Sequence, residues 1–99
     1  MATKNNDQPT KSVTPEQKEQ LLFMMLVQQH RQIALVGMGE EADPATGKNE
    51  TDVATVKFAM DTLSMLQKFT DGNLTPEMSE YLARTLELLR TRFANQTGE

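Results

Sequence analysis

A helix stop followed at once by a new helix start constrains this chain more than any other feature. The stretch from Met60 to Leu66 has helical apolar spacing, Gly72 adopts left-handed backbone freely, and Thr75-Pro76-Glu77 is a helix start. In such a start the threonine oxygen accepts a hydrogen bond from a free backbone N–H, proline presets φ, and glutamate favours the positive helix end. The segment therefore predicts an antiparallel helical hairpin with Gly72 in a left-handed turn.

The same start signal occurs earlier in the chain, as Thr14-Pro15-Glu16-Gln17, where Gln17 also completes a capping box. A weaker start lies within residues 49–52, and Gly37 and Gly39 supply stops after the first helix. We therefore expect an all-α protein with a single helical domain over residues 14–94. The expected helices are at about 15–38, 52–70 and 76–94, with disordered tails at 1–13 and 95–99 because these lack apolar periodicity.

The second helix has more apolar surface than a small bundle covers. At 100° per residue Val56 and Leu63 lie on one side, whereas Phe58, Met65 and Phe69 lie nearly opposite. The resulting apolar arc is roughly 240° wide, compared with ~100° for an ordinary surface helix. The third helix has a normal core face, which consists of Met78, Leu82, Thr85, Leu86, Leu89 and Phe93.

The first helix adds to this surplus, because residues 21–27 are apolar all round. A lone three-helix bundle leaves part of such a run in water, and a second copy is the simplest cover. We therefore predict a homodimer, a protein interaction module with no catalytic activity. The polar belt of residues 28–32 then lies within or beside the contact and sets its register, as a polar layer does in coiled coils. The candidate interface residues are Leu22, Phe23, Leu26, Phe58 and Met65.

Asp61 has two interpretations. Its spacing from Lys57 and Lys68 is typical of surface ion pairs, worth roughly 0.3 to 0.5 kcal/mol. The alternative is a pair with an arginine of another helix, for which Arg92 is the best placed. Such a pair would set the register of the helices rather than take part in catalysis.

No group of residues points to catalysis, a cofactor or a metal. His30 is the only histidine, there is no cysteine, and neither H-x-x-E nor H-E-x-x-H occurs. No nucleophile, base and oxyanion donor can be named together, so we expect no enzyme activity. Glu40, Glu41 and Asp43 could surround a hard cation, but their spacing is not that of a calcium loop. Solvated loop charge is the simpler interpretation, and residues 40–50 are expected to be a connector.

The charge balance argues against nucleic acid as a partner. The net charge is −4 and the isoelectric point is near 5.0, whereas a general phosphate-binding surface needs clustered Lys and Arg. An accessory protein that binds RNA or a ribosomal component through Arg84, Arg90 and Arg92 is the alternative function. Its weakness is that Glu80 and Glu87 lie on the same helix and dilute the positive field.

Membrane association is also disfavoured. The longest apolar run is far shorter than the roughly 20 residues that span a bilayer. The polar residues of the first helix do not gather on one basic face, as an interfacial anchor requires. The polar start of the chain lacks the features of a signal peptide, and the absence of cysteine suits a reducing compartment. We therefore expect a cytoplasmic protein.

Several short motifs occur in an order that resembles a known family. They are Met38-Gly39, Asp43-Pro44 with Thr46-Gly47, Asp61-Thr62-Leu63 with Met65-Leu66, and Thr70 with Gly72-Asn73-Leu74-Thr75. In this order and spacing the chain resembles the bacterial proteins of domain of unknown function family 1844, from about Leu26 to Phe93. The resemblance implies a short helical protein without an assigned activity, so no catalytic residues carry over.

Overall fold

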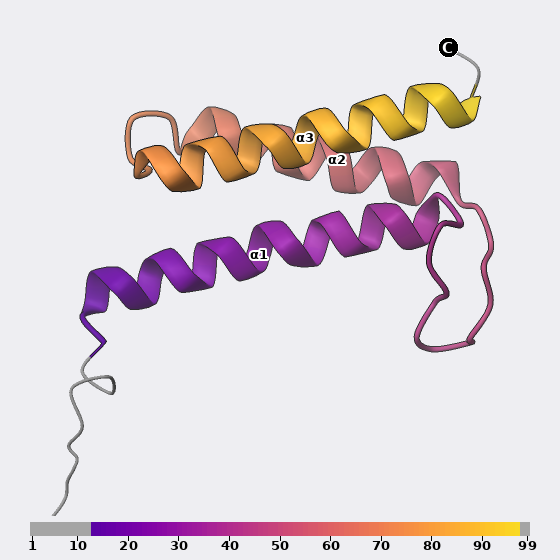
Figure 1. The fold of residues 1–99 in the computed structure, drawn as a ribbon, viewed down its shortest axis with the longest axis horizontal. Coiled ribbons are helices and arrows are strands. Elements are labelled where there is room, and N and C mark those ends of the chain that lie inside the picture. The colour runs from indigo at the N-terminus through magenta and orange to yellow at the C-terminus, as the bar shows by residue number, and fades with distance from the viewer. Residues whose placement is uncertain (1–12, 98–99) are drawn as a thin grey trace, which may run out of the picture.

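Three helices make up the fold of this computed structural model, which describes residues 13–97. They are α1 (Pro15–Gly37), α2 (Val53–Phe69) and α3 (Pro76–Thr97), and no strand occurs within the described range apart from one isolated bridge. Figure 1 shows that α2 runs antiparallel to both α1 and α3, so α2 and α3 form the expected helical hairpin. The all-α prediction is confirmed. Of the expected tails, residues 1–12 and 98–99 lie outside the described part, whereas α3 continues through residues 95–97.

The helices begin where the sequence predicts. Thr14 Oγ1 accepts a hydrogen bond from the Gln17 amide at 3.0 Å, and Gln17 Oε1 accepts one from the Thr14 amide at 3.0 Å, which completes the capping box. Thr75 Oγ1 accepts from the Met78 amide at 3.1 Å at the start of α3. The weaker start is at Asp52, whose Oδ1 accepts from the Thr55 amide at 3.2 Å. All three helices are therefore capped by side-chain oxygens.

The glycines have two different roles. Gly72 has a φ of 86°, so the left-handed turn between α2 and α3 is confirmed. Gly39, with a φ of 80°, follows α1 in the same way. The sequence predicts that Gly37 is a stop after the first helix. In the structure Gly37 is instead the last residue of α1, and it is buried. A Cβ atom there would meet Cγ2 of Val56 at 2.9 Å, so Gly37 is a close-packing position between α1 and α2.

One core joins the three helices. The predicted core face of α3 is confirmed, because all its members are buried except Phe93, which is partly buried and packs against the core. On α2 the predicted division also holds, since Val56 and Leu63 are buried while Phe58 and Phe69 are exposed. The buried apolar residues are Val27, Ala34, Leu35, Met38, Val56, Ala59, Leu63, Met78, Leu82, Leu86 and Leu89.

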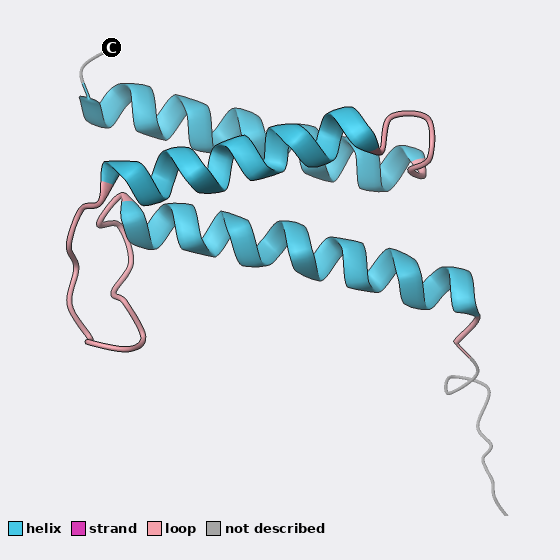
Figure 2. Cartoon of the chain, turned by 180° about the vertical axis from the view of Figure 1, so that it is seen from behind, coloured by secondary structure: helices cyan, strands magenta, loops and turns pink. Residues whose placement is uncertain are grey.

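The two connections differ in length. Figure 2 shows a short turn from α2 to α3 and, at the other end, a long loop from α1 to α2. The neck of the long loop is closed by a bridge between Met38 and Thr51 and by the Asp52 amide, which donates to the Gly37 carbonyl at 2.7 Å. At its tip the Asp43 carbonyl accepts from the Gly47 amide at 2.6 Å.

Two loop carboxylates tie the long loop to the helices. Glu41 accepts a hydrogen bond from Gln32 of α1, and Glu40 forms an ion pair with Arg92 of α3. Gln96 of α3 also donates to the Met38 carbonyl. Glu40 and Glu41 are thus loop charges that also hold the loop against α1 and α3.

Candidate interface on the outer side of helices α1 and α2

A stripe of apolar side chains runs along the exposed side of α1. Leu22, Leu26, Ile33 and Val36 follow one another with Gln29 in the middle, in alternating steps of four and three residues. This is the spacing of a coiled-coil seam, which stays on one side of a helix. Leu22 is 54% exposed, and Leu26 and Ile33 are each 36% exposed. α1 therefore carries a seam that the part of the chain described by the structure does not cover fully.

A second stripe follows the same rule on α2. Thr55, Phe58, Thr62, Met65 and Phe69 are separated by alternating steps of three and four residues. Phe58 and Phe69 are each 70% exposed and Met65 is 41% exposed. The Thr62 hydroxyl donates to the Phe58 carbonyl at 2.8 Å, so this polar side chain is satisfied within its own helix.

The two stripes meet at the loop end of the helices. Ile33 and Val36 of α1 and Thr55 of α2 line one cleft of about 380 Å³, which is walled by Asp43 and Pro44 of the long loop. From this cleft α1 and α2 run antiparallel and side by side (Figures 1 and 2), so the two stripes follow neighbouring helices. We call this surface the outer face. Its members are Leu22, Leu26, Gln29, Ile33, Val36, Thr55, Phe58, Thr62, Met65 and Phe69.

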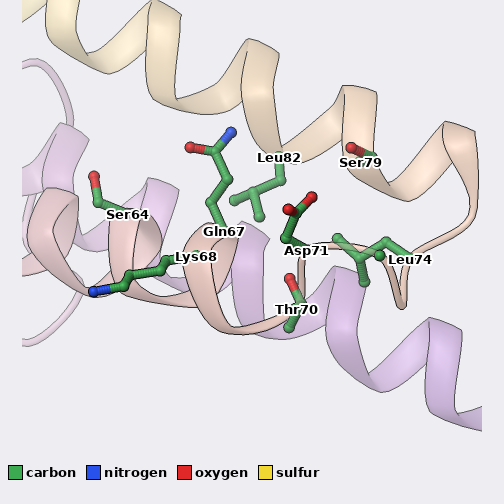
Figure 3. Close-up of a pocket in the computed structure, with 9 residues that line it drawn as sticks. Ser64, Gln67, Lys68, Thr70, Asp71, Leu74, Ser79 and Leu82 are labelled. Carbon is green, nitrogen blue, oxygen red and sulfur yellow. The ribbon is translucent and has the colours of Figure 1, made fainter.

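A more polar pocket of about 430 Å³ lies between the end of α2 and the start of α3 (Figure 3). Gln67 and Asp71 point into the space between the helices, whereas the Lys68 side chain extends away from it. Ser79 and Asp71 both line this pocket, and no hydrogen bond joins their side chains in the described part of the chain.

The described residues contain no group of three or more His, Cys, Asp or Glu side chains that could hold a metal ion. His30 is half-buried, and its Nδ1 lies 3.0 Å from the Leu26 carbonyl oxygen. Its ring is thus engaged with the backbone of its own helix. None of the helices between residues 13 and 97 combines the length and the apolar character needed to cross a membrane.

The arginines of α3 are engaged within the chain. Arg84 forms an exposed ion pair with Glu80 at 2.6 Å, and Arg90 donates to the Ser64 hydroxyl at 3.0 Å. Arg92 pairs with Glu40 rather than with Asp61, because the long loop lies against the end of α3. The predicted Asp61–Arg92 register pair is therefore not formed within the chain, and Asp61 is exposed. All three arginines thus make contacts within the chain, and their side chains also remain exposed.

Four of the five predicted interface residues lie on the outer face and are exposed: Leu22, Leu26, Phe58 and Met65. Phe23 differs, because it packs against the core and lines a pocket between the starts of α1 and α3. Ile33 and Phe69 of the outer face were not among the predicted interface residues, whereas Gln29 belongs to the polar belt that was expected within or beside the contact. The alternating steps of three and four residues are the signal in the sequence that includes Ile33 and Phe69.

The comparisons with known proteins identify the family of this chain and assign no activity to it. A family model described as a domain of unknown function, DUF1844, matches residues 20–95. The chain therefore belongs to the DUF1844 family, as the order of its motifs indicated. Neither the search of curated proteins nor the search of solved structures found a match.

Proposed function

We propose that this protein is a non-enzymatic interaction module that self-associates as a dimer through the outer face. The observation that carries the proposal is that both α1 and α2 have an exposed apolar seam on the same side of the molecule. The proposed location is the cytoplasm, since a chain without cysteine gains no disulfide from an oxidising compartment.

The size of the apolar surface supports a protein partner. Taking roughly 150 to 200 Å² for a fully exposed large side chain, the exposed fractions leave on the order of 600 Å² of apolar area on the outer face. Monomeric proteins rarely expose more than about 300 to 600 Å² in one patch, and a standard interface buries about 800 Å² on each partner. The outer face is thus close to the area that one side of a stable interface needs.

The charge distribution supports a second copy as the partner. The chain has a net charge of −4, yet none of the ten residues of the outer face is charged. Two copies can therefore bring these surfaces together without placing like charges opposite one another. A two-fold dimer also covers the same patch on both chains with a single contact.

Sedimentation equilibrium at micromolar concentration tests the proposal. The wild type should sediment as a dimer, and changing Phe58 and Met65 together to glutamate should shift it toward the monomer, because carboxylates lose water in the contact. The matched control adds two glutamates elsewhere, at Ala83 and Thr91, which are exposed on α3. A monomeric wild type, or equal weakening by the control variant, would refute self-association through the outer face.

A further inference from the structure

The outer face has a polar centre and apolar residues on both sides of it. Gly37 of α1 lies level with Thr55 and Val56 of α2, because a Cβ on Gly37 would contact both side chains. Both helices rise by the same distance per residue and run in opposite directions. The contact at Gly37 therefore determines which residue of α2 lies beside each residue of α1 along the helix axis. The pairs that share a level are Val36 with Thr55, Ile33 with Phe58, Gln29 with Thr62, Leu26 with Met65, and Leu22 with Phe69.

The two ends of the outer face have opposite shapes. At the loop end Pro44 of the long loop forms one side of the cleft of about 380 Å³, and Ile33 and Val36 also line this cleft. At the other end Leu22 and Phe69 are exposed over 54% and 70% of their surface, and neither pocket of the described residues at that end includes either of them. If a second copy is rotated by half a turn so that its helices run in the opposite direction, the exposed end of each copy lies opposite the cleft of the other. The two ends are therefore complementary in shape.

The central polar pair limits the register of such a contact. The Gln29 side chain is exposed and makes no hydrogen bond with other described residues, whereas the Thr62 hydroxyl already donates to the Phe58 carbonyl. A carboxamide has both a donor and an acceptor, so two Gln29 side chains can satisfy each other. Any register that places Gln29 against leucine or phenylalanine leaves a buried amide without a partner, which costs about 1 to 3 kcal/mol.

We propose that two copies pack face to face with α1 antiparallel to α1, about a two-fold axis at Gln29, so that Phe69 of each copy fills the cleft beside Pro44 of the other. This inference rests on the proposed self-association and specifies its geometry. In this arrangement Leu26 of one copy faces Ile33 of the other. The competing two-fold arrangement places α1 against α2 of the second copy, and Leu26 then faces Met65.

Disulfide trapping separates the two arrangements, and the absence of native cysteine makes it clean. A tagged Leu26→Cys variant is mixed with an untagged Ile33→Cys variant and oxidised, and the expected product is a linked heterodimer, because the two Cβ atoms face each other within reach of a disulfide. The matched control is the mixture of Leu26→Cys with Met65→Cys, which should remain unlinked. Both mixtures leave Gln29 in place.

The outcomes distinguish this geometry from self-association itself. If the wild type is a dimer and only the Leu26 with Met65 mixture links, or neither mixture links, the antiparallel α1 geometry is wrong while self-association stands. If the wild type is a monomer, both proposals fail. This includes the case in which the outer face of the monomer binds a helix of another protein. Linking of Leu26 with Ile33 alone supports the geometry.

Phe69 provides an independent test of the cleft. Phe69→Ala should weaken dimerisation by about tenfold or more, as expected for a buried aromatic anchor. Phe69→Leu, which keeps an apolar side chain, should weaken it less. Because Phe69 is 70% exposed in the single chain, circular dichroism should show unchanged helix content in both variants. Unchanged dimerisation of the Phe69→Ala variant would show that Phe69 does not fill the cleft.

Discussion

Gly37 of α1 lies so close to Val56 of α2 that a Cβ atom on the glycine would sit 2.9 Å from the valine Cγ2. The same Cβ would lie 3.3 Å from the Asp52 carbonyl oxygen, which is backbone and cannot rotate away. Val56 is itself almost wholly buried. This contact sets the closest approach of the two helices and the level at which the halves of the outer face meet.

Gly37→Ala should therefore destabilise the fold. Alanine favours a helix by up to about 1 kcal/mol relative to glycine, but overpacking of a tight contact costs about 1 to 3 kcal/mol. We expect a net loss of about 1 kcal/mol in the free energy of unfolding, measured by urea denaturation. Combining it with Val56→Ala should recover part of the loss, so the double variant is more stable than the sum of the single effects predicts. Simple additivity would mean that this contact is not tight.

Gly72→Val should also destabilise the protein, by about 1 kcal/mol or more, for a different reason. No atom outside the immediate chain neighbours lies within 4 Å of a Cβ at this position, so the cost is backbone strain at a φ of 86° and not a clash. Gly72→Asn should cost less, because asparagine tolerates left-handed backbone. The thermal midpoint measures both, and equal effects of valine and asparagine would contradict a strain mechanism.

The cap of α2 predicts a pH dependence. The hydrogen bond with the Thr55 side chain, followed by that of the Thr55 amide, holds the pKa of Asp52 below its ordinary value of 3.8. A lowered folded-state pKa gives stability that is fully present above the unfolded-state pKa and is lost as the pH falls through the folded-state pKa. Asp52→Asn keeps a capping oxygen but does not titrate. The difference in thermal midpoint between the two proteins should therefore change between pH 5 and pH 2, roughly the range over which a lowered carboxyl pKa titrates, and a constant difference would exclude this role.

Duplex DNA should not bind measurably near physiological salt. The chain has a net charge of −4, and Arg84 and Arg92 pair with carboxylates within the chain. A gel-shift titration at about 0.15 M salt checks this. Tight binding that weakens steeply as salt rises would instead favour the alternative function through the arginines of α3.

Local signals in the sequence were sufficient to place the helices. The caps at Thr14 and Thr75 involve atoms only three residues apart, and the turn at Gly72 depends on one backbone angle. The core face of α3 and the two-sided apolar surface of α2 follow from helical periodicity. These features could be predicted because their physical causes lie within one or two turns of the chain.

The tertiary structure decided everything that depends on how the helices face one another. Only the packed helices show that the exposed seams of α1 and α2 lie on the same side, that Phe23 turns inward, and that Arg92 reaches Glu40 across 52 residues. Gly37 reads as a helix stop in the sequence but acts as a packing position. The sequence by itself determined where each helix begins and how much apolar surface it carries, since those depend on short-range hydrogen bonds and residue spacing. Which apolar surface remains uncovered depends on the approach and rotation of whole helices, which no local pattern contains.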